Sequence, residues 1–198
     1  MLEWWRAVAE TVATTGRLIL RTWDGGDLDP FIAATNTPEV MRWLGGVWSY
    51  EEHEAAFDRL QSYERDYGHT FWAVEDRASG ELLGFCGLKR VNSPGAEAIA
   101  GTPEVGWRLR ESAWGKGIAK EAAIASLDLA FGRFGYEEVV AITVEGNAAS
   151  QGLMRRLGMK RRRDMDYVDP RHIEELGPAL VWSIAAAGWP AARAAALA

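Results

Sequence analysis

The segment from Glu104 to Ala122 constrains the fold of this chain more than any other part of its 198 residues. A short apolar strand leads into a turn with Gly115 and Gly117, and the turn leads into a long helix. The first N–H groups of a helix have no partner within the helix, and the helix dipole adds partial positive charge there. Because glycine lets the backbone approach a ligand closely, the turn predicts a site for a phosphate or pyrophosphate.

Two common phosphate-binding motifs do not fit this turn. A P-loop has Lys and then Ser or Thr after its second glycine, whereas Ile118 follows Gly117. A dinucleotide-binding fingerprint needs a third small residue at position 120, where Lys120 stands. The spacing alone leaves two interpretations open: an anion site, or a glycine turn that only starts a helix.

The hydrophobic pattern predicts one α/β domain with a mixed sheet. We expect strands at 17–21, 71–74, 82–88, 104–109, 139–144, 159–167 and 179–185. Helices are expected after the capping box Ser49–Glu52, over 115–134, and from Asn147 to Gly158.

The domain limits follow from the same pattern. We expect a domain over residues 16–188, preceded by an N-terminal arm at 1–15 that is a short helix or a loose segment. The alanine-rich tail at 189–198 is expected to fray or to form a short helix.

Composition excludes several classes of protein. With 22 basic and 28 acidic residues the formal charge is -6, which argues against general nucleic-acid binding. No apolar stretch approaches about 20 residues and no signal peptide is evident, so we expect a cytoplasmic protein without a membrane partner. The single cysteine, Cys86, and three histidines without metal-ligand spacing predict no metal site.

Residues 114–119, Trp-Gly-Lys-Gly-Ile-Ala, resemble the acyl-CoA signature of the GNAT N-acetyltransferases. Gly117 and Ala119 match the signature. Trp114 stands where a Gln or Arg is usual, a replacement common in the branch that resembles the ribosomal-protein alanine N-acetyltransferases. Three further stretches resemble that branch: the hairpin at 79–88, Glu-Val-Gly-Trp at 104–107, and Asn147-Ala-Ala-Ser150 followed by Leu-Gly-Met at 157–159.

This resemblance covers about residues 15–185 and implies a fold and a co-substrate. The implied fold is α/β (α+β), with a mixed, mostly antiparallel central sheet that splays where acetyl-CoA binds and helices on both faces. The implied cofactor-binding residues are Leu109, Trp114, Gly115, Lys116, Gly117, Ile118, Ala119, Lys120 and Asn147. An equal alternative is that Lys116 and Lys120 are solvated helix residues. In the same way, Asn147 is either a cofactor contact or only a helix N-cap.

The resemblance also implies direct attack of an amine on the acetyl thioester, with two catalytic residues. Glu104 is the expected base, acting through a water, and Ser150 the expected proton donor to the leaving thiolate. A backbone N–H near 105–107 is expected to polarise the carbonyl. The alternatives are a surface or paired carboxylate at Glu104 and an ordinary first-turn serine at Ser150.

The acceptor is expected between the early helices and the last hairpin. Trp43, Trp48 and Tyr50 would form one wall, and the acidic segment 164–175, with Tyr167, the other. An aromatic wall that faces acids suits a cationic amine, either a small molecule or a protein N-terminus. The alternative is that these aromatics belong to the core and that the acids are solvated. The 10 tryptophans also suggest a subunit contact, and hence a homodimer.

Other functions remain open at this point. The same fold could bind acyl-CoA without turnover, as a regulatory module. A cysteine nucleophile at Cys86 is disfavoured by its apolar neighbours, and a nicotinamide dehydrogenase by Lys120.

Overall fold

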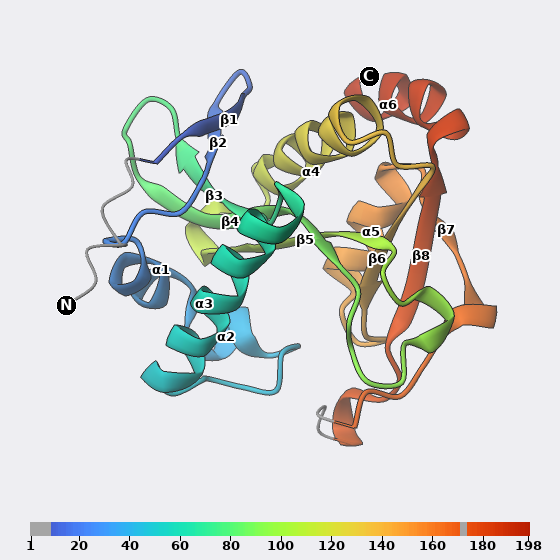
Figure 1. Ribbon diagram of the computed structural model, residues 1–198, viewed down its shortest axis with the longest axis horizontal. Helices are drawn as coiled ribbons and strands as arrows, with labels where there is room; N and C mark the ends of the chain where they lie inside the picture. The colour runs from blue at the N-terminus through green and yellow to red at the C-terminus, as the bar shows by residue number, and fades with distance from the viewer. Residues whose placement is uncertain (1–8, 171–173) are drawn as a thin grey trace.

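The computed structural model describes residues 9–170 and 174–198, whose strands form one mixed sheet (Figure 1). The strands lie in the order β1-β2-β3-β4-β5-β6-β8-β7. Their bounds are Thr11–Thr14 (β1), Leu18–Arg21 (β2), Phe71–Asp76 (β3), Leu82–Arg90 (β4), Pro103–Leu109 (β5), Glu138–Thr143 (β6), Lys160–Arg161 (β7) and Leu180–Ala185 (β8). Neighbours pair antiparallel except β5 and β6, which run parallel. The predicted mixed, mostly antiparallel sheet is confirmed.

Helices cover both faces of this sheet, as the sequence predicts. Their bounds are Leu28–Thr35 (α1), Pro38–Met41 (α2), Tyr50–Tyr67 (α3), Ile118–Asp128 (α4), Ala148–Arg156 (α5) and Trp189–Leu197 (α6). Successive side chains of a strand point to opposite faces. On β3, Trp72 joins the core cluster under α4 and α5, whereas Phe71 joins the cluster under α1 and α3.

The sheet separates between β5 and β6. Antiparallel pairing joins β4 to β5 along the whole of β5. Among the described residues a single pair, Glu104 with Val140, joins β5 to β6. Beyond Glu104 the edge of β5 that faces β6 therefore has no strand partner, and Figure 1 shows β6 and β8 turned away from the β2–β5 hairpins.

The structure differs from the sequence-based expectation before β2, whereas the tail adopts the short helix that was one of its two expected forms. Thr11–Thr14, expected in an arm, forms β1 and pairs with β2, because Val12 and Ala13 pack on the main core. The tail forms a helix, α6, whose Trp189 is buried. No helix in residues 9–170 and 174–198 combines the length and apolar character needed to cross a bilayer.

The strand expected over residues 159–167 is much shorter in the structure than predicted. Only Lys160 and Arg161 pair with β8, and the chain then turns through a 3₁₀ segment, Arg163–Met165. The guanidinium of Arg161 bonds the carboxylate of Asp166, and this link draws the chain into a turn. Tyr167 returns to the sheet through an isolated bridge to Ala179.

The long helix begins later than expected, at Ile118 instead of Gly115. Gly115 and Gly117 have φ of +70° and +76°, a left-handed conformation that ends regular helix geometry and favours glycine. Past Asp128 the helix continues through a π-turn, Leu129–Arg133, close to the expected end.

Candidate functional site

A cleft of about 1240 Å³ opens where β5 and β6 separate. The glycine turn, the start of α4, the β6–α5 turn and the α2–α3 loop all contribute to its walls. The cleft gathers most of the predicted site residues, namely Trp43, Trp48, Glu104, Leu109, Trp114, Gly115, Gly117, Ile118, Ala119, Lys120, Asn147, Ser150 and Tyr167. Lys116 and Tyr50 are not part of its lining.

The glycine turn presents its backbone to this cleft. A Cβ added at Gly115 would meet nothing within 4 Å, so the left-handed backbone, not crowding, requires glycine there. At Gly117 the same addition would lie 3.5 Å from the Arg17 guanidinium. The turn therefore leaves open space over the unpaired N–H groups that start α4, which suits a bound anion.

Arg17, just before β2, holds this turn in place. Its Nη1 donates to the carbonyl oxygen of Lys116 at 2.8 Å, and its Nη2 lies 2.6 Å from Glu121 Oε2 on α4. Burial alone would raise the pKa of Glu121, but hydrogen bonds from Thr15 and Arg17 outweigh it and lower this pKa. Sequence reasoning missed this link because its partners lie about a hundred positions apart.

The polar groups near the turn have internal partners too. Trp114 Nε1 donates to the carbonyl oxygen of Leu109 at 2.8 Å, so two of the predicted cofactor-binding residues bond each other. Lys120 Nζ donates to the carbonyl oxygen of Ala196 at 2.7 Å, which helps to dock α6 on α4. Lys116 is exposed and stands outside the lining.

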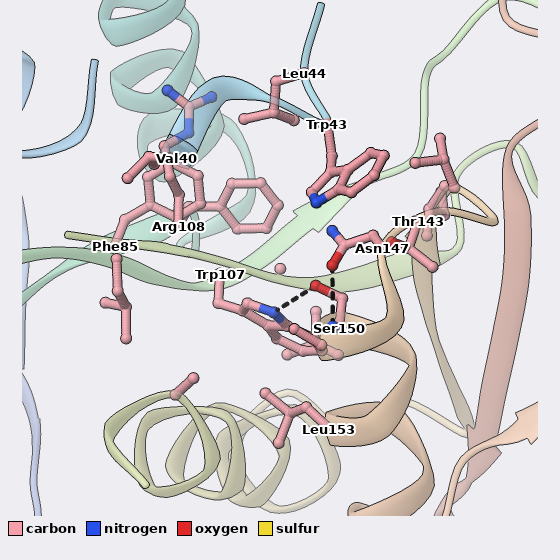
Figure 2. A pocket seen from close by; sticks show the side chains of 18 of the residues that line it. Val40, Trp43, Leu44, Phe85, Trp107, Arg108, Thr143, Asn147, Ser150 and Leu153 are labelled. Carbon is pink, nitrogen blue, oxygen red and sulfur yellow. Dashed lines mark hydrogen bonds between the residues drawn. The ribbon is translucent and has the colours of Figure 1, made fainter. Parts of the chain in front are cut away.

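Asn147 and Ser150 begin α5 at the wall that faces β5 (Figure 2). Asn147 Oδ1 accepts from the Ser150 backbone N–H at 3.1 Å, so Asn147 is an N-cap that also lines the cleft. Trp107 Nε1 donates to Ser150 Oγ at 3.3 Å. Since a hydroxyl both accepts and donates, the Ser150 proton remains available to a third group.

Glu104 lies at the point where β5 and β6 part, and it is only 9% exposed. Its Oε2 forms an ion pair with Lys89 Nζ of β4 at 3.0 Å. Burial works to lower the pKa of Lys89, but the Glu104 carboxylate outweighs it and raises this pKa. Lys89 therefore stays protonated at neutral pH and keeps its positive charge beside Glu104. Lys89 is a cleft residue that sequence reasoning missed.

Trp43 reaches across the cleft from the α2–α3 loop to the β6–α5 turn. Figure 2 shows its ring beside Asn147. A Cβ added at Gly146 would lie 2.4 Å from this ring, so Trp43 packs directly on the Gly146 backbone. Tyr50, by contrast, is 52% exposed and its hydroxyl donates to Asp29.

The expected acidic wall is less acidic than its sequence suggests. Asp164 and Asp166 form ion pairs with Arg162 and Arg161. Tyr167 and Asp169 are buried and line the cleft. Burial raises the pKa of Tyr167. His172, in the same expected wall, lies outside the described residues.

Comparisons with known proteins agree with this architecture. Residues 17–160 match the family model described as an acetyltransferase (GNAT) domain. The uncharacterized protein YkkB of Bacillus subtilis (strain 168) is 30% identical over 152 residues, which are 76% of this chain and 86% of that protein. The chain belongs to the GNAT acetyltransferase family.

Solved structures share this GNAT fold. An acetyltransferase from Agrobacterium tumefaciens str. C58 superposes with a TM-score of 0.71 at 21% identity, over 93% of this chain and 98% of that one. A proposed ribosomal-protein-serine acetyltransferase from Vibrio cholerae gives 0.66 at 18% identity, over 87% and 95% of the two chains. At these identities the likeness concerns the fold alone.

A cysteine nucleophile at Cys86 finds no support in this GNAT chain. Cys86 is fully buried on β4, and burial raises the pKa of its thiol to about 12, so the thiolate nucleophile is suppressed. In the part of the chain that the structure describes, no group of three or more His, Cys, Asp or Glu residues is arranged to hold a metal ion.

Proposed function

We propose that this GNAT protein is an acetyl-CoA-dependent N-acetyltransferase that acetylates a primary amine. The observation that carries the proposal is one continuous cleft that joins the glycine turn to Glu104, at the place where β5 leaves β6. The turn suits the pyrophosphate of a coenzyme, and Glu104 suits proton removal from an amine.

The residues of the turn fit acetyl-CoA on two grounds. The left-handed backbone at Gly115 and Gly117 leaves its surface free of Cβ atoms, and the following N–H groups through Lys120 lack helical partners. Asn147, Leu109 and Trp114 would line the path from this turn toward Glu104. Bound acetyl-CoA would supply an activated acetyl thioester.

Glu104 would act as the base. An alkylammonium has a pKa of about 10, so most of the acceptor arrives protonated and must lose that proton before it attacks. The Glu104 carboxylate, which lies 3.0 Å from Lys89 Nζ, would accept that proton directly or through a water. Holding both substrates in one cleft supplies further acceleration.

Ser150 would donate the proton that the leaving thiolate needs. Its Oγ already accepts from Trp107 Nε1, so its own proton points elsewhere. Backbone N–H groups of 105–107 on the unpaired edge of β5 would polarise the thioester carbonyl.

The test is free-thiol release from acetyl-CoA across a panel of primary amines. We expect amine-dependent release in the wild type and a loss of about a hundredfold or more in Glu104→Gln, with acetyl-CoA affinity in calorimetry little changed. Glu138→Gln is the matched control, because Glu138 lies on β6 outside the cleft and pairs with Arg162. An undiminished rate in Glu104→Gln would remove Glu104 from the mechanism. Acetyl-CoA binding without thiol release for any amine would favour a non-catalytic binding module.

A further inference from the structure

Arg108 is a cation in the cleft that neither the acetyl-CoA turn nor the proposed chemistry uses. It lies on β5 four positions after Glu104 and lines the cleft. Its Cζ lies 4.9 Å from the ring centre of Trp48 and 5.2 Å from that of Phe85. Phe31 adds a third ring at 5.7 Å. The Trp48 ring, expected to receive a cation, is thus already paired with one from the chain itself.

Arg108 has no anionic partner within the described part of the chain. Arg21, also partly buried, forms ion pairs with both Asp27 and Glu75. In the described part of the chain, no carboxylate forms an ion pair or a hydrogen bond with Arg108. Its Nε is buried and has no hydrogen-bond acceptor. Burial lowers its pKa to about 10, with no nearby acid to offset the change. A guanidinium carries five N–H donors, and aromatic faces satisfy none of them as an oxygen would.

Arg108 also faces away from the glycine turn. Alternate residues of a strand share a face, so Glu104, Gly106 and Arg108 point toward α1 and α3. Trp107 points to the opposite face, toward Ser150, and Figure 2 shows Trp107 and Arg108 on opposite sides of β5. At Gly106, between Glu104 and Arg108, a Cβ would lie 2.5 Å from the Phe71 ring, so this apolar ring, and no side chain of β5, lies between the two charged positions.

We propose that Arg108 binds a carboxylate of the acceptor, so that the preferred substrate is an amine that also carries an acidic group. This inference rests on the proposed function of the cleft. A guanidinium pairs with a carboxylate through two parallel N–H···O bonds, which would supply the acceptors that Arg108 lacks. Four residues of strand span about 13 Å, so the amine and the carboxylate are separated by several bonds, as in an ω-amino acid or a short peptide.

The first test compares ω-amino acids of increasing chain length with n-alkylamines of equal length, by thiol release. In the wild type we expect kcat/KM to favour the amino acid by about tenfold or more at the best length. Arg108→Gln should bring this ratio close to one. Arg110→Gln is the matched control, since Arg110 follows on the same segment, pairs with Glu81 and lies outside the lining, and it should keep the wild-type ratio. An unchanged ratio in Arg108→Gln, or no preference in the wild type, overturns the proposal.

The second test needs neither turnover nor a variant. Amine-free alkanoates are titrated into the wild-type protein and followed by NMR, with and without saturating acetyl-CoA. Binding that persists in the presence of acetyl-CoA and perturbs the Trp48 indole N–H supports the acceptor carboxylate. No binding, or displacement by acetyl-CoA, overturns it, and displacement would mean that Arg108 serves a coenzyme phosphate. Because alkanoate binding is read without catalysis, failure of this inference and failure of the proposed reaction are distinguishable.

Discussion

At the scale of single residues, Gly146 sets the width of the cleft by allowing Trp43 to lie on its backbone. A Cβ at this position would approach the Trp43 ring to 2.4 Å, closer than carbon atoms tolerate. We therefore expect Gly146→Ala to displace Trp43 and to raise KM for the acceptor severalfold, with a smaller change in kcat. Gly132→Ala is the control, because a Cβ there meets nothing within 4 Å. Steady-state kinetics in which the two variants behave alike would show that Trp43 does not shape the acceptor side.

The sequence was informative about single residues wherever a local motif specified them. Gly117, Ala119 and Asn147 stand in motifs with fixed spacing, and the cleft gathers all three. Arg108 and Lys89 were missed, because a strand residue shows no sign in sequence of what faces it across the sheet. Glu104 was found by its motif, but its ion pair with Lys89 depends on the antiparallel register of β4 and β5.

At the scale of elements, the contact between the chain before β2 and the start of α4 fixes the glycine turn. Arg17 joins the Lys116 carbonyl and the Glu121 carboxylate, and both bonds would be lost in Arg17→Gln. Because this pair is partly exposed, we expect only about a two- to fivefold rise in Kd for acetyl-CoA. Calorimetry measures this change. Arg193→Gln is the control, since Arg193 pairs with Asp128 at the far end of the same helix, and an equal effect there would refute a local role for Arg17.

Element prediction succeeded where hydrophobic period and capping signals agreed. Ser49 and Glu52 form the expected capping box, and α3 begins at Tyr50. It missed β1 and made β7 too long, because both are short edge strands that depend on pairing with distant partners. The site depends on a property that no local pattern encodes, namely that β5 and β6 share only one residue pair.

At the scale of the whole molecule, buried histidines link stability to pH. Burial lowers the pKa of His69 below its ordinary 6.5, and it does the same for His53 with help from the Arg108 charge. Both side chains are neutral in the folded state near pH 7, whereas the unfolded chain takes up protons below about 6.5. We expect the free energy of unfolding to be greatest above pH 6.5 and to fall as the pH drops. Denaturant unfolding of wild type and His69→Gln between neutral pH and about pH 5 checks this, and an equally steep fall in the variant would contradict the assignment to His69.

Product analysis shows whether one cleft brings an acetyl donor and an amine together. The protein is incubated with acetyl-CoA and an amine panel that includes ω-amino acids and short peptides. Thiol release is followed, and the mass of each acceptor is measured by mass spectrometry. We expect thiol release that requires the amine, with one acetyl group gained per amine and both signals lost in Glu104→Gln. Acetyl-CoA binding in calorimetry with no acetylated amine and no amine-dependent thiol would contradict it.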